Sequence, residues 1–205
     1  MYPEVSFLDP TYTFTVSNKQ TAAGIADAMN HIFEQYFCED STILNDGFME
    51  AGLKSLMING RKCLENPEDY NARAEMMLVC TYGCNRIYCL GNSESGWPCH
   101  GMEHALSAYY DITHGEGLAI ITPRWMKHIL SDKTVDRFVK YGVNVFGIDS
   151  NLDKMEIANK AIEETYKFYE SINIPMHLKD VGIDESRINE MAKHVADNEG
   201  LENAW

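Results

Sequence analysis

The 205-residue sequence has no apolar run that approaches the roughly 20 residues needed to span a bilayer. Its N-terminus, Met1-Tyr2-Pro3-Glu4, lacks both the basic start and the apolar stretch of a secretory signal peptide. Neither a membrane anchor nor a secretory leader is therefore indicated. We expect a cytoplasmic protein that has no membrane partner.

Basic residues are also few in this chain. It has 17 Lys and Arg against 31 Asp and Glu, which gives a formal net charge of -14 at pH 7. A surface of this charge repels the phosphate backbone of nucleic acids, so nucleic acid is excluded as an expected partner. The acidic residues are dispersed along the sequence, as on an ordinary solvated surface.

The sequence contains six cysteines but lacks any Cys-x-x-Cys pair. Zinc ribbons depend on such pairs, and disulfide scaffolds are typically short secreted chains, so neither class of protein is indicated. Most of the cysteines fall among apolar residues of expected helices, which predicts buried free thiols. They are Cys38, Cys63, Cys80, Cys84, Cys89 and Cys99.

A helical hydrophobic pattern covers most of the chain. Strand-like alternation is confined to residues 1–16, where Val5, Phe7 and Phe14 alternate with smaller or polar residues. The pattern predicts a short extended segment there and an all-α domain over residues 17–205, with 45% hydrophobic residues to form one core. The expected helices span residues 19–37, 44–64, 67–90, 98–110, 114–130, 131–146, 152–172 and 184–196.

The most informative feature is the close spacing of His100, His104 and His114. Neutral imidazole is the commonest side-chain metal ligand, and residues four apart share one face of a helix. His100 and His104 are spaced in this way, and so are Asp27 and His31 upstream. A helix break just before His114 would fold the next helix back beside His100, whereas one straight helix would separate the two by about 21 Å. A carboxylate with several imidazoles suits Fe2+, Zn2+, Ni2+ or Co2+.

The residues around these histidines resemble a known family signature. Residues 97–117, which read Trp97-Pro98-Cys99-His100 at the start and Thr113-His114-Gly115 toward the end, are similar to the metal-binding signature of the iron-containing, or group III, alcohol dehydrogenases. The phrase from Glu103 to Gly115 is most similar to the butanol dehydrogenase and aldehyde reductase branch. Upstream, Asp9-Pro10 and the stretch from Gln20 to His31 resemble the second hallmark of the family.

This resemblance implies a role for each candidate site residue. The positions that match the family's metal ligands are Asp27, His31, His100 and His114. His104 matches a position near the metal and the nicotinamide that is not itself a ligand, and it is the candidate for proton relay. The implied metal is Fe2+ or Zn2+.

The resemblance also implies which part of the enzyme the chain represents. It covers the C-terminal, dehydroquinate synthase-like helical domain, whereas the N-terminal dinucleotide-binding domain is absent and the C-terminal end is expected to be truncated. No Gly-Gly-Gly-Ser phosphate-binding loop occurs in the sequence, and Gly115-Glu116-Gly117 does not follow an expected strand.

The intact enzyme is implied to be a homodimer that uses NAD(H) or NADP(H). Its substrates are implied to be primary aliphatic alcohols or aldehydes, whose oxygen the metal polarises for hydride transfer. This chain alone is expected to be inactive, because it lacks the domain that binds the hydride donor.

Two other function classes remain open at this point. A metal-dependent hydrolase could use the same donor set to activate water, although the sequence has neither a His-Asp dipeptide nor a His-Glu-x-x-His motif. A non-catalytic metal-binding domain is the other alternative, since the hydride donor's domain is missing.

Overall fold

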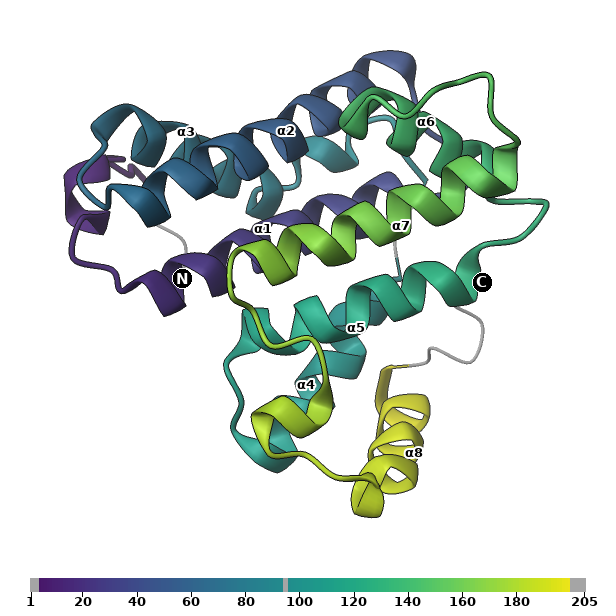
Figure 1. Cartoon of the computed structure of the whole chain (residues 1–205). Helices are drawn as coiled ribbons and strands as arrows, with labels where there is room; N and C mark the ends of the chain where they lie inside the picture. Colours follow the sequence, from purple (N-terminus) through teal and green to yellow (C-terminus); the bar gives the residue numbers. More distant parts are fainter. Residues whose placement is uncertain (1–3, 94–95, 200–205) are drawn as a thin grey trace.

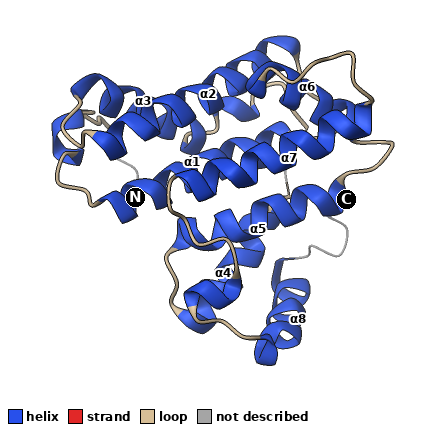
Figure 2. Cartoon of the chain, viewed as in Figure 1, coloured by secondary structure: helices blue, strands red, loops and turns tan. Residues whose placement is uncertain are grey.

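The computed structural model describes residues 4–93 and 96–199, and this part of the chain contains α-helices and 3-10 helices but no strand (Figure 2). The α-helices are α1 (Asn18–Tyr36), α2 (Ile43–Glu65), α3 (Tyr70–Cys84), α4 (Pro98–Tyr110), α5 (His114–Ile129), α6 (Val135–Phe146), α7 (Lys154–Ser171) and α8 (Ile188–Glu199). The 3-10 helices are η1 (Pro10–Thr13), η2 (Ile87–Cys89), η3 (Leu178–Val181) and η4 (Glu185–Arg187). The predicted all-α fold class is confirmed. No described helix is long and apolar enough to cross a membrane.

The N-terminal segment differs in one detail from the expected extended chain. Pro10–Thr13 form one turn of 3-10 helix, because Pro10 has the backbone φ that a helix requires and Asp9 caps the turn. The Asp9 carboxylate accepts the Thr11 N–H at 3.0 Å. Ser17 then caps α1, so the long helix begins where the periodicity predicts.

The third helix is shorter than the predicted span of residues 67–90. It begins at Tyr70, because the Asp69 side chain accepts the Ala72 N–H at 3.0 Å and caps it there. It ends at Cys84, and Arg86 then adopts a left-handed φ of 66°. The apolar pattern continues past this break, which is why periodicity alone did not show it.

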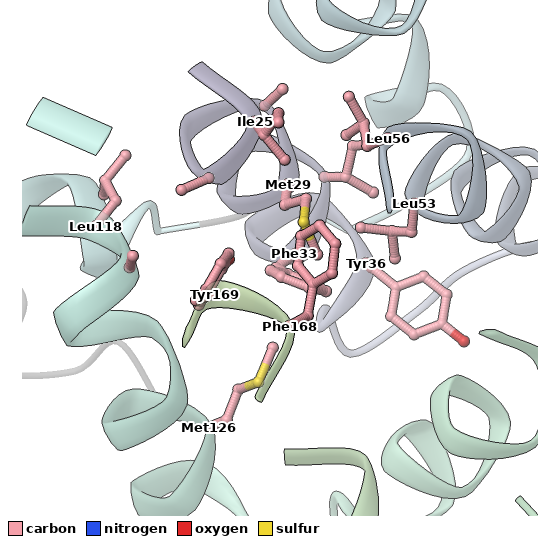
Figure 3. Close-up of a cluster of buried hydrophobic side chains, with 14 of the residues drawn as sticks. Ile25, Met29, Phe33, Tyr36, Leu53, Leu56, Leu118, Met126, Phe168 and Tyr169 are labelled. Atoms are coloured by element: carbon pink, nitrogen blue, oxygen red, sulfur yellow. The ribbon is translucent and has the colours of Figure 1, made fainter. Parts of the chain in front are cut away.

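Helix α1 lies at the centre of the fold, with α2 and α3 on one side and α5 on another (Figure 1). Helix α7 packs against α5 and α6. Fully buried side chains from α1 recur every three or four residues and contact the other helices of the core. Burying each such side chain contributes about 1.5–3 kcal/mol. Figure 3 shows the centre of this core, with Ile25, Met29, Phe33, Tyr36, Leu53, Leu56, Leu118, Met126, Phe168 and Tyr169.

Helix α4 packs on two neighbours through different faces. Its Ala105 and Leu106 pack against Met191 and Val195 of α8 in a second, smaller apolar cluster. The opposite face carries His100 and contacts α1 and α5. This arrangement buries the polar side chains of His100 and Glu103 between α4 and its neighbours.

All six cysteines are free, as predicted. Cys38, Cys63 and Cys99 are buried, whereas Cys80 and Cys89 are half-buried. Cys84 is exposed, so the prediction of burial was wrong for this residue. It lies at the last position of α3, where the helix face turns to solvent.

An ion pair joins α2 to α6. Arg137 donates to both carboxylate oxygens of Asp46 at 2.8 Å, and Lys140 donates to the same carboxylate at 3.1 Å. The Asp46 side chain is only 6% exposed, and Arg137 also donates to the backbone carbonyl of Tyr36. Removing one partner would leave a nearly buried charge uncompensated.

We therefore expect Asp46→Ala to lower the free energy of unfolding by about 3 kcal/mol, because the Arg137 guanidinium loses its counter-charge. Urea denaturation followed by circular dichroism measures this loss. The control, Asp136→Ala, removes the exposed pair with Lys154 and should cost much less. Equal losses in the two variants would contradict the assignment of a structural role to the α2–α6 pair.

Candidate metal centre

Three helices bring the candidate ligands together. Asp27 and His31 lie one turn apart on α1, His100 is in the first turn of α4, and His114 is the first residue of α5. Helix α4 ends at Tyr110, and the next residue, Asp111, caps it with a left-handed φ of 52° before α5 begins. The His100 and His114 ring centroids are 5.4 Å apart, as the predicted turn between antiparallel helices requires.

The three imidazoles direct the same ring atom at one carboxylate oxygen. Asp27 Oδ1 lies 3.4 Å from Nε2 of His31, 3.7 Å from Nε2 of His100 and 3.6 Å from Nε2 of His114. These distances exceed those of ordinary N–H···O hydrogen bonds. They match the three edges that would join the oxygen to the nitrogens in a coordination tetrahedron, since ligand atoms about 2.1 Å from a metal ion lie about 3.4 Å apart.

The surroundings of the donor atoms also suit a bound cation. Asp27 Oδ1 and His100 Nε2 are buried and have no hydrogen-bond partner among the residues that the structure describes. Unpartnered buried polar atoms are costly unless a ligand satisfies them. The Asp27 and His114 side chains are still 35% and 39% exposed, so a small molecule can approach from their side.

The electrostatic environment shifts the pKa of each group. Burial raises the pKa of Asp27, but the three imidazoles more than offset this and hold it below its ordinary value. Burial lowers the pKa of His100, yet Asp27 and Glu34 together raise it to about 9. The carboxylate that contacts His114 Nδ1 raises the pKa of that ring, whereas burial lowers the pKa of His31. The carboxylates beside His100 and His114 therefore favour positive charge at these two rings.

Sequence reasoning missed two acidic residues at this centre, Glu34 on α1 and Glu103 on α4. Both are fully buried, and they contact Nδ1 of His100 and His114, respectively. Glu34 had a recognisable signal, because it lies seven residues after Asp27 and directly follows the apolar pair Ile32-Phe33. A charged residue on the inner face of a central helix indicates a partner in the core.

His104 lies beside the four candidate ligands and is exposed to solvent. Its ring stacks on that of His114, with centroids 5.8 Å apart, and lies 6.2 Å from that of His100. It lies near the centre on its open side, where its ring nitrogen, His114 and Glu103 form a second group of donor atoms close enough to share a metal ion. On the other side of the site, the Trp97 ring meets His31 edge-on at 5.4 Å.

Glycine allows α5 to approach α1 closely. A Cβ atom on Gly115 would lie 2.0 Å from the backbone carbonyl oxygen of Ala23, which lies one turn before Asp27. A Cβ atom on Gly117 would lie 2.8 Å from the Glu103 side chain. These two glycines therefore set the distance between the helix that carries His114 and its neighbours.

The fold and these contacts define an all-α domain that gathers one carboxylate and three imidazoles at the junction of three helices. Residues 21–205 match the family described as "Fe-containing alcohol dehydrogenase family, C-terminal". The chain belongs to this family, and the resemblance noted in its sequence is confirmed.

Relatives with described activities are also similar to this chain. It is 49% identical over 201 residues to NADH-dependent butanol dehydrogenase A of Clostridium acetobutylicum, a match that covers 98% of this chain and 51% of that protein. It is 32% identical over 197 residues to an NADPH-dependent aldehyde reductase of Escherichia coli, covering 96% of this chain and 50% of that protein.

A solved structure has the same fold. The crystal structure of NADH-dependent butanol dehydrogenase A from Thermotoga maritima aligns with a TM-score of 0.89 at 36% identity, covering 95% of this chain and 48% of that one. The chain thus spans about half the length of the relatives that it matches.

Gly115→Ala tests the close approach of α5 to α1. We expect this variant to be destabilised by about 1–3 kcal/mol, because the new methyl group meets backbone atoms that must shift. Gly24→Ala on α1 is the matched control. Its Cβ would meet nothing within 4 Å, so it should stabilise the helix by about 0.5–1 kcal/mol. Thermal unfolding of both variants measures the two effects, and a neutral Gly115→Ala would disprove the packing constraint.

Proposed function

We propose that this chain binds one divalent metal ion through Asp27, His31, His100 and His114. In this proposal it is the metal-binding part of an NAD(P)-dependent alcohol dehydrogenase or aldehyde reductase. The observation that carries the proposal is the approach of three imidazole Nε2 atoms to Asp27 Oδ1 at 3.4 to 3.7 Å. Membership of the iron-containing alcohol dehydrogenase family supports the reaction class.

The proposed metal is Fe2+ or Zn2+. Three imidazoles and one carboxylate make a donor set that suits these ions, whereas Mg2+ and Ca2+ favour more oxygen ligands. The family description, which names iron, supports the first choice. Four protein ligands leave room for a substrate oxygen when the ion accepts a fifth.

The metal, when bound, polarises the substrate oxygen for hydride transfer to or from the nicotinamide. Asp27 offsets part of the positive charge, while the neutral imidazoles leave the rest available to the substrate. The substrate approaches from the exposed side of Asp27 and His114. His104 lies on this open side, where its ring can carry the hydroxyl proton between substrate and solvent.

The hydride donor in this proposal is NADH or NADPH, and the substrate is a primary aliphatic alcohol or aldehyde. The names of the relatives support this, since they include NADH-dependent butanol dehydrogenases and an NADPH-dependent aldehyde reductase. The sequence has no glycine-rich phosphate-binding loop after a strand, so the nucleotide is proposed to bind to a domain outside these 205 residues.

The metal assignment predicts that the purified chain binds about one Zn2+ or Fe2+ per molecule. Ions at 100 times the dissociation constant should stabilise it by about 2.7 kcal/mol. His100→Ala and His114→Ala should lose the stoichiometric ion, as measured by elemental analysis after dialysis. His128→Ala, which removes an exposed histidine from α5, should keep it. Equal metal content in all three variants would refute the assignment.

Turnover tests the proposal that the metal and the nucleotide bind to different domains. Loaded with Fe2+ or Zn2+, these 205 residues should not oxidise NADH or NADPH with butyraldehyde as substrate, because they contain no glycine-rich phosphate-binding loop. A longer natural chain that includes such a domain should be active and should lose activity on Asp27→Ala. The absorbance of the reduced nicotinamide at 340 nm follows the reaction. Robust turnover by the 205-residue chain would contradict the proposal that the nucleotide binds outside these residues.

A further inference from the structure

Two buried carboxylates lie behind the candidate ligands, on the side away from Asp27. Glu34 and Glu103 are 1% and 0% exposed, and they contact Nδ1 of His100 and Nδ1 of His114. They belong to different helices, α1 and α4, yet each meets the ring atom opposite the one that faces Asp27. The two histidines are therefore held between carboxylates at both ring nitrogens.

The second oxygens of the two carboxylates have different kinds of hydrogen-bond partner. Glu34 Oε1 accepts the backbone N–H of Cys99 at 2.6 Å, and a backbone N–H can only donate. Glu103 Oε1 accepts the hydroxyl of Ser107, which can rotate and can also accept. The Ser107 hydroxyl has a second acceptor within reach, the Ile112 carbonyl oxygen at 3.4 Å.

We propose that Glu34 and Glu103 are positioning residues that fix the tautomers of His100 and His114 for metal binding. An ionised carboxylate only accepts, so each one requires a proton on Nδ1 and leaves the Nε2 lone pair directed at the cation. This inference rests on the proposed metal site and adds to it the residues that select the binding tautomer. His31 has no such support, since its Nδ1 is buried without a hydrogen-bond partner among the described residues.

Replacing Glu34 by glutamine should place a hydrogen-bond donor, the amide NH2 group, against His100 Nδ1. The glutamine oxygen must stay with the Cys99 N–H, because its NH2 group cannot accept that proton. The NH2 group then faces His100 Nδ1 and donates to it, which moves the ring proton to Nε2. That tautomer has no lone pair for a metal ion at Nε2.

Replacing Glu103 by glutamine should keep the correct tautomer. The NH2 group can donate to Ser107, whose hydroxyl then donates to the Ile112 carbonyl. The glutamine oxygen remains free to accept Nδ1–H of His114. Both substitutions replace one buried carboxylate by an amide, so a difference between them reports the direction of the hydrogen bond rather than the loss of a carboxylate.

The experiment compares Glu34→Gln and Glu103→Gln in the full chain, with Zn2+ as the probe. Competition with a chromophoric chelator gives the dissociation constant of each variant. Loss of a carboxylate that hydrogen-bonds to a metal-binding histidine typically lowers metal affinity by about 10–100-fold. We therefore expect Glu34→Gln to bind Zn2+ at least about tenfold more weakly than Glu103→Gln. Equal weakening, or a larger effect of Glu103→Gln, would overturn the proposal.

Nuclear magnetic resonance of the imidazole nitrogens reads the tautomer directly. Long-range 1H–15N spectra of the zinc-loaded wild type and of Glu103→Gln should show protonated Nδ1 and metal-bound Nε2 for both His100 and His114. His100 of Glu34→Gln should lose this pattern. An unchanged pattern in that variant would reject the positioning role, because a purely structural carboxylate would not change the tautomer.

Two controls separate the possible failures. Wild-type protein that binds no Zn2+ would refute the proposed metal site itself, whereas normal wild-type binding with unaffected variants would refute only the positioning role. Urea unfolding in the presence of EDTA shows whether each metal-free variant is folded. If Glu34→Gln is unfolded, Glu103→Leu tests the same claim. Leucine removes the carboxylate and with it the hydrogen-bond acceptor for His114 Nδ1–H. The Glu103→Leu variant should therefore bind Zn2+ more weakly than Glu103→Gln.

Discussion

The contact of one buried carboxylate with two groups of α4 determines how the centre is built. Glu34 of α1 accepts the Cys99 N–H in the first turn of α4 and also contacts the His100 ring. The first N–H groups of a helix need an acceptor from elsewhere, and an anion there is favoured by the helix dipole. The same carboxylate therefore holds α4 against α1 and orients the His100 ring.

The second constraint is the backbone distance between α1 and α5. Gly115 lets α5 meet the Ala23 carbonyl directly, and Gly117 makes space for the buried Glu103 side chain. His114 precedes these glycines at the start of the same helix, so its distance from Asp27 follows from their packing. A site whose donor atoms lie 3.4 to 3.7 Å apart tolerates little change in this distance.

Local spacing explains which parts of this arrangement could be predicted from the sequence. The i, i+4 pairs of Asp27 with His31 and of His100 with His104 follow from helix geometry. The choice of His100 and His114 rather than His104 as ligands came from the family resemblance. The partner of Glu34 could not be identified, because His100 lies 66 residues away and their contact depends on how α1 and α4 dock. The start of α3 was misplaced for a similar reason, since both Pro67 and Asp69 suit a helix start and only the folded chain shows that Asp69 caps it.

Ligands from three helices also link the centre to the stability of the fold. One α-helix can supply a pair of ligands on one face, so a four-donor site requires that α1, α4 and α5 meet. Their junction buries Glu34 and Glu103, whose desolvation opposes folding unless cationic or donating groups surround them. A cation among the imidazoles would supply that compensation and join the three helices at once. In the proposed site, metal affinity and fold stability would therefore be coupled through the same two carboxylates.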